Sequence, residues 1–191
     1  MDRRRLPLLQ PTNLLLPIVD SPHQQGWMVQ TVQPTIIFID YSLPMNPPQL
    51  IAASDHAGFL LKQHLSGEAD KLGCSFLDLG PFDDTSVDYP DFVHLLAKAL
   101  VERSNAMGLL ICGSGNGVCI TANRYPHIRA ALAWLPEIAR LARAHNNANV
   151  LCLPARFMDV ELATQCLSEF VQTPFEQGRH ANRVAKINPQ A

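Results

Sequence analysis

Charged residues are scarce in this chain: they make up 17% of its 191 residues, and the formal net charge is only −2. The sequence therefore has no excess of positive charge that would attract a nucleic acid or an anionic membrane surface. Recognition of a phosphate group has to come from a few local arginine or histidine side chains. Apolar residues make up 47% of the chain, which is typical of a compact globular domain and argues against wholesale disorder.

Long apolar runs are also absent. No run reaches the roughly 18 residues that a membrane-spanning helix needs. The N-terminus carries Arg3, Arg4 and Arg5 before a leucine-rich stretch, but prolines interrupt that stretch and no small-residue cleavage site follows. We therefore expect neither a membrane span nor a secretory signal peptide.

Cysteines are few, and their spacing excludes two common uses. Their number is odd and no pair has the spacing C-x-x-C, which argues against a disulfide framework and against a zinc knuckle. We predict free thiols in a reducing, cytoplasmic compartment, and no bound metal. The five residues are Cys74, Cys112, Cys119, Cys152 and Cys166.

The first 48 residues differ from the rest, because eight of the 15 prolines fall there. Proline at this density breaks helices and confines strands to sheet edges. We expect residues 1–48 to be a poorly ordered extension, with at most one strand near residues 35–40. An alternative is that Met45 is the natural start. The second domain predicted is the globular part, residues 49–191.

From residue 49 onward, short apolar runs alternate with segments whose apolar residues recur at helical spacing. Strands that are nearly all apolar and alternate with helices indicate a parallel sheet covered on both faces. In such sheets ligands bind beyond the carboxyl ends of the strands. The predicted strands are 50–54, 76–79, 107–112, 130–134 and 150–153. Helices are predicted around residues 61–72, 92–100, 116–124, 138–142, 162–170 and 178–187.

A loop with three glycines, residues 112–117, directly follows the third predicted strand. Glycine allows tight turns and close approach to a ligand, and the start of a helix can bind an anion. The dinucleotide pattern G-x-G-x-x-G fails, because its last glycine would fall at Val118 or Ile120, and no P-loop lysine follows. Cys112, at the end of the strand, is a candidate nucleophile or base. The alternatives are a ligand-free turn and a structural cysteine.

Further polar groups follow other strands and helices. Asp55 and His56 follow the first strand, although Asp55 could simply cap a helix. His145 and Asn146 end a helix, where the histidine could merely complement the helix dipole and the asparagines could be a C-cap. Another pair, Arg179 and Arg183, is four residues apart, so one helix face would carry both; it could bind phosphate or be a solvated basic face.

Taken together and in order, these motifs resemble type B ribose-5-phosphate isomerases, a sugar-phosphate isomerase family that also includes galactose-6-phosphate and allose-6-phosphate isomerases. The resemblance covers residues 49–187. The motifs are Ser54-Asp55-His56-Ala57-Gly58-Phe59, Asp88-Tyr89-Pro90-Asp91, Ile111-Cys112-Gly113-Ser114-Gly115-Asn116-Gly117, Thr121-Ala122-Asn123-Arg124, Arg129-Ala130-Ala131, Ala144-His145-Asn146, Asn149-Val150-Leu151 and Gly178-Arg179-His180.

The resemblance implies a Rossmann-like three-layer α/β/α sandwich with a parallel five-stranded sheet, no cofactor, and a homodimer or dimer of dimers whose sites use residues from both subunits. It implies interconversion of ribose 5-phosphate and ribulose 5-phosphate, with Cys112 as the base. One subgroup uses a glutamate after the glycine loop instead, where this chain has Val118.

The remaining family roles are implied residue by residue. Ser114 would assist proton transfer, and His145 would open the furanose ring. The other matches bind substrate: the backbone of Gly113, Gly115, Asn116 and Gly117 would hold the enediolate, Asp55 and Asn146 the hydroxyls, and His56, Arg156, Arg179 and Arg183 the phosphate.

Three other functions stay open at this point. A six-carbon sugar phosphate is the nearest alternative substrate. A regulator that only binds sugar phosphate would not require a base such as Cys112. A cysteine hydrolase would need a Cys–His pair and an acyl site, whereas the arginines favour phosphate.

Overall fold

The computed structural model describes residues 48–103 and 105–188. The predicted extension lies outside the described residues apart from Pro48. The elements that follow are, in chain order, β1 (Gln49–Ser54), α1 (Phe59–Lys71), β2 (Ser75–Asp78), α2 (Tyr89–Val101), β3 (Ala106–Cys112), α3 (Asn116–Ala122), β4 (Ala130–Leu132), α4 (Pro136–Asn146), β5 (Val150–Pro154), α5 (Val160–Gln172) and α6 (Arg179–Val184).

The five strands form one parallel sheet in the order β2-β1-β3-β5-β4. The direction in which strands are added to the sheet changes between β1 and β3, because β2 lies on one side of β1 and all later strands lie on the other. In parallel α/β sheets such a switch point opens a crevice at the carboxyl ends of the strands. The loops after β1 and β3 flank this crevice, and they carry Asp55 and Cys112.

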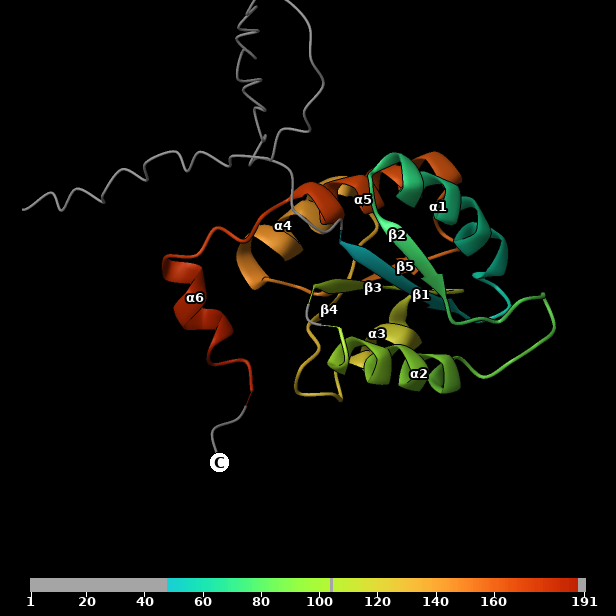
Figure 1. Cartoon of the computed structure of the whole chain (residues 1–191), viewed down its shortest axis with the longest axis horizontal. Coiled ribbons are helices and arrows are strands. Elements are labelled where there is room, and N and C mark those ends of the chain that lie inside the picture. Colours follow the sequence, from blue (N-terminus) through green and yellow to red (C-terminus); the bar gives the residue numbers. More distant parts are fainter. Residues whose placement is uncertain (1–47, 104, 189–191) are drawn as a thin grey trace, which may run out of the picture. The chain divides into compact units, whose positions relative to one another are not determined.

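Helices cover both faces of the sheet, as Figure 1 shows, with α1, α4 and α5 on one side and α2 and α3 on the other. Alternation along the strands explains the two layers. In β1, Leu50 and Ala52 pack under the first layer, and Ile51 and Ala53 pack under the second. Because both faces are covered, β3 and β5 are buried and apolar almost throughout.

Every strand and helix predicted from residue 49 onward is present, but several ends differ, and the possible strand near residues 35–40 lies outside the described residues. The predicted strand 130–134 ends early at Leu132, because the chain turns toward Pro136, which starts α4, and leaves Trp134 and Leu135 exposed. The strand 76–79 is shifted to 75–78. Two helices are shorter than expected: the one over 116–124 ends at Ala122, and the last begins only after Gly178 and ends at Val184.

Lys62 is a structural feature that helical spacing alone did not predict. Its side chain is completely buried on α1, where the ammonium group hydrogen-bonds Asp78 and the Pro81 carbonyl oxygen, the latter at 2.8 Å. Burial lowers the pKa of Lys62, while the Asp78 carboxylate acts in the opposite direction. The pair ties α1 to the carboxyl end of β2.

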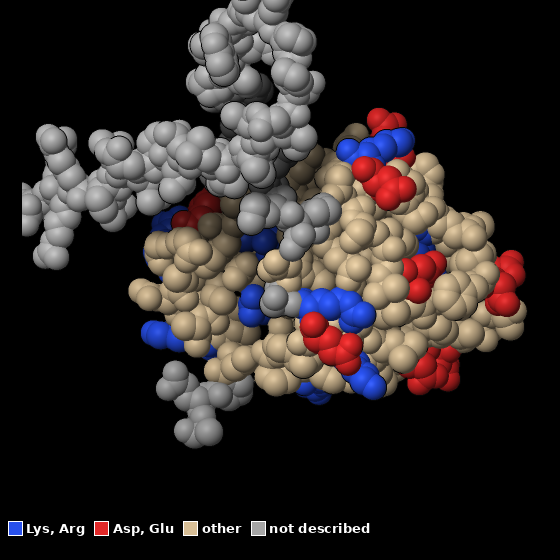
Figure 2. Space-filling model, in the orientation of Figure 1, with Lys and Arg blue, Asp and Glu red and all other residues tan. Residues whose placement is uncertain are grey.

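Charges of both signs are interspersed among a mostly uncharged surface on the face drawn in Figure 2, which agrees with the small net charge. Among the described residues, no helix combines the length and the apolar character needed to cross a membrane.

Candidate active site

Three loops meet at the carboxyl edge of the sheet, and backbone hydrogen bonds hold them together. The Asp55 N–H, after β1, donates to the Ile111 carbonyl of β3 at 3.0 Å. The chain after β5 continues this ladder, since the Ala155 N–H donates to Cys112 O and the Arg156 N–H to Gly113 O, each at 3.0 Å. Asp55, Cys112 and Arg156 therefore lie at one edge, as the sequence predicted.

Cys112 ends β3, and its side chain is only 4% exposed. The Gly115 N–H donates a hydrogen bond to the Cys112 sulfur, with N and Sγ 3.2 Å apart. A backbone amide in this position stabilises negative charge on the sulfur, which a thiolate base requires. The bond exists because Gly115 adopts a left-handed conformation, with φ of 72°, and so turns its amide back toward the strand.

The glycine loop is packed so closely that side chains would not fit in it. A Cβ at Gly115 would lie 2.3 Å from Leu132 Cδ1, and a Cβ at Gly117 would lie 2.5 Å from the Tyr89 ring. Between them, Ser114 and Asn116 are exposed, and the Asn116 N–H points to Ser114 Oγ at 3.4 Å. Surrounding side chains therefore fix the loop's shape, a property that the alternative of a ligand-free turn would share.

Arg156 lies directly beside this loop. Its side chain covers Gly113, whose Cβ position would be 3.3 Å from Arg156 Nε. Because Gly113 directly follows Cys112, a guanidinium group beside Gly113 can bind an anionic group of a ligand in the same crevice. A side chain at position 113 would have to shift the Arg156 side chain by a few tenths of an ångström.

Asp55 and His56 both have structural contacts. Asp55 is 8% exposed, and its Oδ1 accepts the Gly58 N–H at 3.0 Å, so the predicted alternative of a capping role applies to one of its oxygens. Among the described residues, no hydrogen bond to its other oxygen is found. His56 Nδ1 accepts the Val87 N–H at 3.4 Å, which places its ring at the mouth of the same edge.

The remaining predicted residues lie elsewhere in the chain. His145 and Asn146 end α4, which runs back to the amino end of β5, and α6 packs beside α4 with Arg179 and Arg183. Strand β5 has five residues, and a strand rises about 3.3 Å per residue, so its two ends are about 13 Å apart. One chain does not bring these four residues to Cys112.

This second group has a geometry of its own. The His145 and His180 rings are stacked, and Glu176 Oε2 lies 3.5 Å from His145 Nε2 and 3.8 Å from His180 Nε2. The Glu176 N–H donates to the Ala144 carbonyl at 3.0 Å, which fixes the carboxylate beside the end of α4. Glu176 and His180 were not predicted as site residues, although His180 stood inside a motif of the resemblance.

Positive charge surrounds His180. Burial, followed by the charges of His145, Arg179 and Arg183, lowers its pKa, and Glu176 opposes this. His145, Glu176 and His180 offer ligand atoms within 4.8 Å of one another, a grouping that could hold a metal ion. The two arginines disfavour a cation, and Arg179 Nε already faces the His180 Nε2 lone pair at 3.4 Å. The cluster fits an anionic ligand better than a metal.

A family profile described as Ribose/Galactose Isomerase matches residues 50–187, nearly the whole described part. The chain belongs to this family. The match confirms the resemblance inferred from the motifs.

Family relatives are similar over most of their length. "Probable ribose-5-phosphate isomerase B" of Mycoplasma pneumoniae is 44% identical over 146 residues, covering 76% of this chain and 95% of the relative. "Ribose-5-phosphate isomerase B" of Escherichia coli is 35% identical over 133 residues, covering 70% and 89%.

Solved structures of the family confirm the α/β sandwich. A ribose 5-phosphate isomerase of Thermotoga maritima superposes with a TM-score of 0.71 at 44% identity, covering 73% of this chain and 97% of that one. The Mycoplasma genitalium enzyme, solved with bound ribulose 5-phosphate, gives 0.70 at 41% identity, covering 73% and 93%.

Two other cysteines lie close to the family's glycine loop. Cys119 is half-buried on α3, and a hydrogen bond with Cys152 is the main cause that lowers its pKa to about 7. Burial, and then Cys119 and Cys112, raise the pKa of Cys152 well above its ordinary value. Cys152 is buried in the core and Cys119 packs against it, and the lowered pKa of Cys119 favours its thiolate form.

Proposed function

We propose that this chain is an aldose–ketose isomerase that interconverts ribose 5-phosphate and ribulose 5-phosphate, with Cys112 as general base. The observation that carries the proposal is the Cys112 sulfur, buried at the end of β3 and hydrogen-bonded by Gly115 inside a rigid glycine loop. Family membership and relatives named ribose-5-phosphate isomerase B support it.

In the proposed reaction, the Cys112 thiolate removes the proton from C2 of the open-chain aldose. The electron pair forms the C1–C2 double bond of an enediolate, whose negative oxygen the loop amides would stabilise. The thiol then returns the proton to C1, while the hydroxyl proton passes from O2 to O1 with the help of Ser114. The product is the ketose, and no electron leaves the substrate, so no redox cofactor is needed.

Phosphate binding would anchor the sugar far from the reacting carbons. Arg156 lies beside Gly113, and His56 lies at the same edge. The guanidinium group of an arginine can fork onto two phosphate oxygens. Binding energy from the phosphate would orient C1 and C2 against the sulfur.

We further propose that a second copy of the chain completes each site. His145, Asn146, Arg179 and Arg183 lie at the opposite end of the subunit from Cys112, as β5 separates the two edges. In a homodimer with twofold symmetry, the carboxyl edge of each subunit can meet the amino edge of its partner, which gives two equal sites. His145 would then open the furanose ring of a sugar bound over the partner subunit's glycine loop.

Glu176 would orient His145 for this step. Its carboxylate lies 3.5 Å from His145 Nε2 and is fixed through its own backbone to Ala144. A carboxylate in this position holds the imidazole ring in one orientation, so that it can face the ring oxygen of the sugar.

The cysteine-hydrolase alternative is less well supported than the isomerase. The hydrogen bond to the Cys112 sulfur comes from a backbone amide and not from an imidazole, unlike the Cys–His pair of a hydrolase. A six-carbon substrate is the second candidate, because the family's description includes galactose isomerases.

The test is an isomerase assay with ribose 5-phosphate and allose 6-phosphate side by side, with Cys112→Ala as the control. We expect turnover of ribose 5-phosphate with the higher kcat/KM and its loss in the variant. A higher kcat/KM for allose 6-phosphate would select the six-carbon alternative, and no turnover of either would refute the proposed activity.

A further inference from the structure

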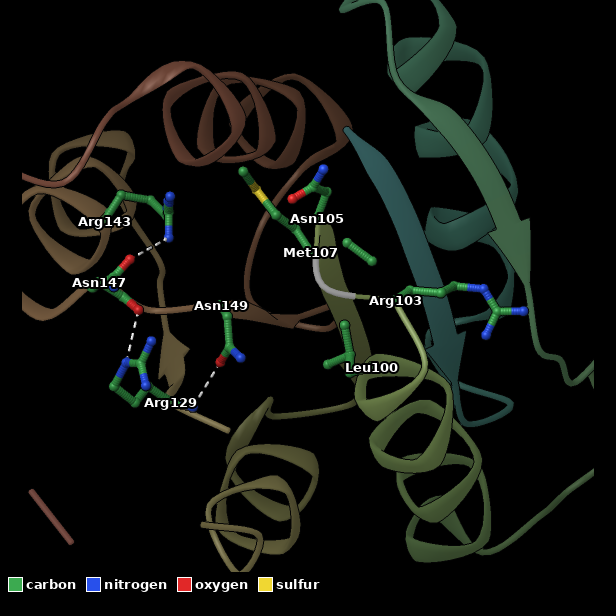
Figure 3. A pocket seen from close by; sticks show the side chains of 9 residues that line it. Leu100, Arg103, Asn105, Met107, Arg129, Arg143, Asn147 and Asn149 are labelled. Carbon is green, nitrogen blue, oxygen red and sulfur yellow. Dashed lines mark hydrogen bonds between the residues drawn. The ribbon is translucent and has the colours of Figure 1, made fainter. Parts of the chain in front are cut away.

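A cavity of about 310 Å³ opens at the amino edge of the sheet, the end opposite Cys112 (Figure 3). It lies between the ends of α2 and α4, beside the first residues of β3. Its size falls in the range of small-molecule binding sites. The residues that line it are Leu100, Arg103, Asn105, Ala106, Met107, Arg129, Arg143, Asn147 and Asn149.

The lining is strongly one-sided in charge. Among the described residues that line it are three arginines and three asparagines, and none of them is an aspartate or a glutamate. Arg103 lies at the rim, where its Nη1 is 3.4 Å from Glu102 Oε2. In Figure 3, Arg103 points away from the cavity, whereas Arg129 and Arg143 lie on either side of Asn147. Two guanidinium groups without a carboxylate in the lining repel each other unless an anion lies between them.

Hydrogen bonds explain part of what these two arginines do. Arg129 Nε donates to the Asn147 carbonyl at 2.8 Å, and Arg143 Nη1 donates to Asn147 Oδ1 at 3.2 Å and to the Ala148 carbonyl at 2.5 Å. These bonds hold the turn after α4, where Asn147 has a φ of 46°. A purely structural role would end with these contacts.

The contacts leave donors over. Arg143 Nε is buried and has no hydrogen-bond partner among the described residues. A buried donor without a partner costs about 1–3 kcal/mol, so such groups are normally satisfied by protein, water or ligand. Burial lowers the pKa of both Arg129 and Arg143, and the charge of Arg129 lowers that of Arg143 further. Burial thus disfavours the positive charge on both arginines, and a bound anion would stabilise that charge.

We propose that this cavity binds the phosphate group of a small phosphorylated metabolite between Arg129 and Arg143, at a site that shares no residue with the proposed active site. Phosphate fits because its oxygens can accept several N–H groups at once, and guanidinium groups supply them in matching pairs. The carboxamides of Asn105 and Asn147 would supply further neutral donors, whereas Asn149 Nδ2 already donates to the His127 carbonyl at 2.9 Å. The cavity has room for more than the phosphate alone, since Leu100 and Met107 give it an apolar wall.

The site is also placed to influence the active site. Arg143 lies two residues before His145 on α4, and the turn that both arginines hold follows Asn146 directly. A ligand on these arginines would therefore stabilise the end of the helix that carries the proposed ring-opening residue. This effect on turnover depends on the proposed function, whereas binding itself does not.

The experiment is a calorimetric titration of the full-length protein with inorganic phosphate at constant ionic strength. Arg156→Ala removes a predicted ligand of the catalytic site. Asn105→Asp adds a carboxylate to the cavity without changing side-chain size, and Asn105→Ser is its uncharged control. A parallel titration with glucose 6-phosphate distinguishes a phosphorylated sugar from free phosphate as the preferred ligand.

We expect phosphate binding that survives Arg156→Ala and Asn105→Ser and weakens at least about tenfold in Asn105→Asp. Arg143→Gln should abolish it, in protein whose folding is verified by circular dichroism. The proposal is overturned if Arg156→Ala removes all binding, or if Asn105→Asp and Arg143→Gln both bind like the parent. Either result is independent of whether ribose 5-phosphate is isomerised.

Discussion

The imidazole rings of His145 and His180 are stacked, with centroids 4.1 Å apart and planes 3° from parallel. Two protonated rings cannot be held this close without repulsion, so the stack favours at least one neutral ring. His180 is the buried member, and its pKa is lowered from the ordinary 6.5. Below about pH 6.5 the unfolded chain therefore binds more protons at this residue than the folded chain does. Its contribution to stability is present above that pH and is lost as the pH falls toward the lower folded value.

His180→Asn removes this proton linkage. We expect the variant to unfold at a lower temperature than the parent at pH 8, because packing contacts are lost, and the gap between them to narrow at pH 5.5. Thermal unfolding followed by circular dichroism at both pH values measures it. A gap that is equal or wider at pH 5.5 would contradict the lowered pKa.

Cys112→Ala tests the proposed base. We expect a folded protein whose kcat for ribose 5-phosphate falls by about 10²-fold or more, the scale of a general base. Cys119→Ala makes the same substitution seven residues later and should retain most activity. Steady-state rates of both variants decide the matter, and a normal rate for Cys112→Ala would refute the assignment.

Cys119 should be the most readily alkylated of the other thiols near neutral pH, because its pKa of about 7 gives a large thiolate fraction there. Its labelling by iodoacetamide should rise with pH to half its maximum near pH 7. Cys166, whose pKa burial raises to about 11, is the internal control and should stay unlabelled. Peptide mass spectrometry of the Cys112→Ala variant measures both. Equal labelling of the two residues at pH 7 would show that the hydrogen bond to Cys152 has no such effect.

Gly115 and Gly73 form a matched pair for testing the packing of the loop. Their φ angles are 72° and 71°, but a Cβ at Gly73 would meet nothing within 4 Å. Gly73→Ala should cost only the left-handed backbone penalty, about 1–2 kcal/mol. Gly115→Ala should cost about 1–3 kcal/mol more, because its methyl group would overlap Leu132. Urea unfolding compares them, and equal losses would mean that the loop yields to a methyl group.

A shared site predicts complementation between two inactive variants. Cys112→Ala and His145→Ala should each be inactive alone. In a mixed dimer, one site has the intact cysteine of one subunit and the intact histidine of the other, so random mixing should restore about a quarter of parental activity. Subunits are mixed by mild denaturation and refolding, with each variant refolded alone as the control. Failure to recover activity in verified mixed dimers would place each site within a single chain.

Local patterns in the sequence were sufficient for the elements and for one edge of the site. Apolar strands that end in Asp55 and Cys112 necessarily bring these residues to the same edge, because the strands are parallel. The end of β4 was placed too late, because Ala133 and Trp134 continue the apolar run while the chain already turns toward Pro136. The strand order was not predictable in this way, since neither periodicity nor composition states which strands are neighbours.

The separation of His145 from Cys112 could have been predicted from topology alone. A helix that connects parallel strands runs opposite to them, so residues at its end lie at the amino edge. Glu176 was a different case, because it lies outside any helix or strand, and only its contacts with His145 and the Ala144 carbonyl make it notable. The sequence contained equally little indication that Arg129 and Arg143 lie close together, since their closeness depends on a turn at Asn147.

The ladder that continues past β5 through Ala155 and Arg156 also bears on the entropy of ligand binding. Ordering one residue of a free loop costs about 1–2 kcal/mol of conformational entropy. Because the amides of both residues are already bonded to Cys112 and Gly113, that entropy is lost when the protein folds and not when a sugar phosphate arrives. The catalytic edge is preorganised, so more of the phosphate's binding free energy remains available to align C1 and C2 with the sulfur.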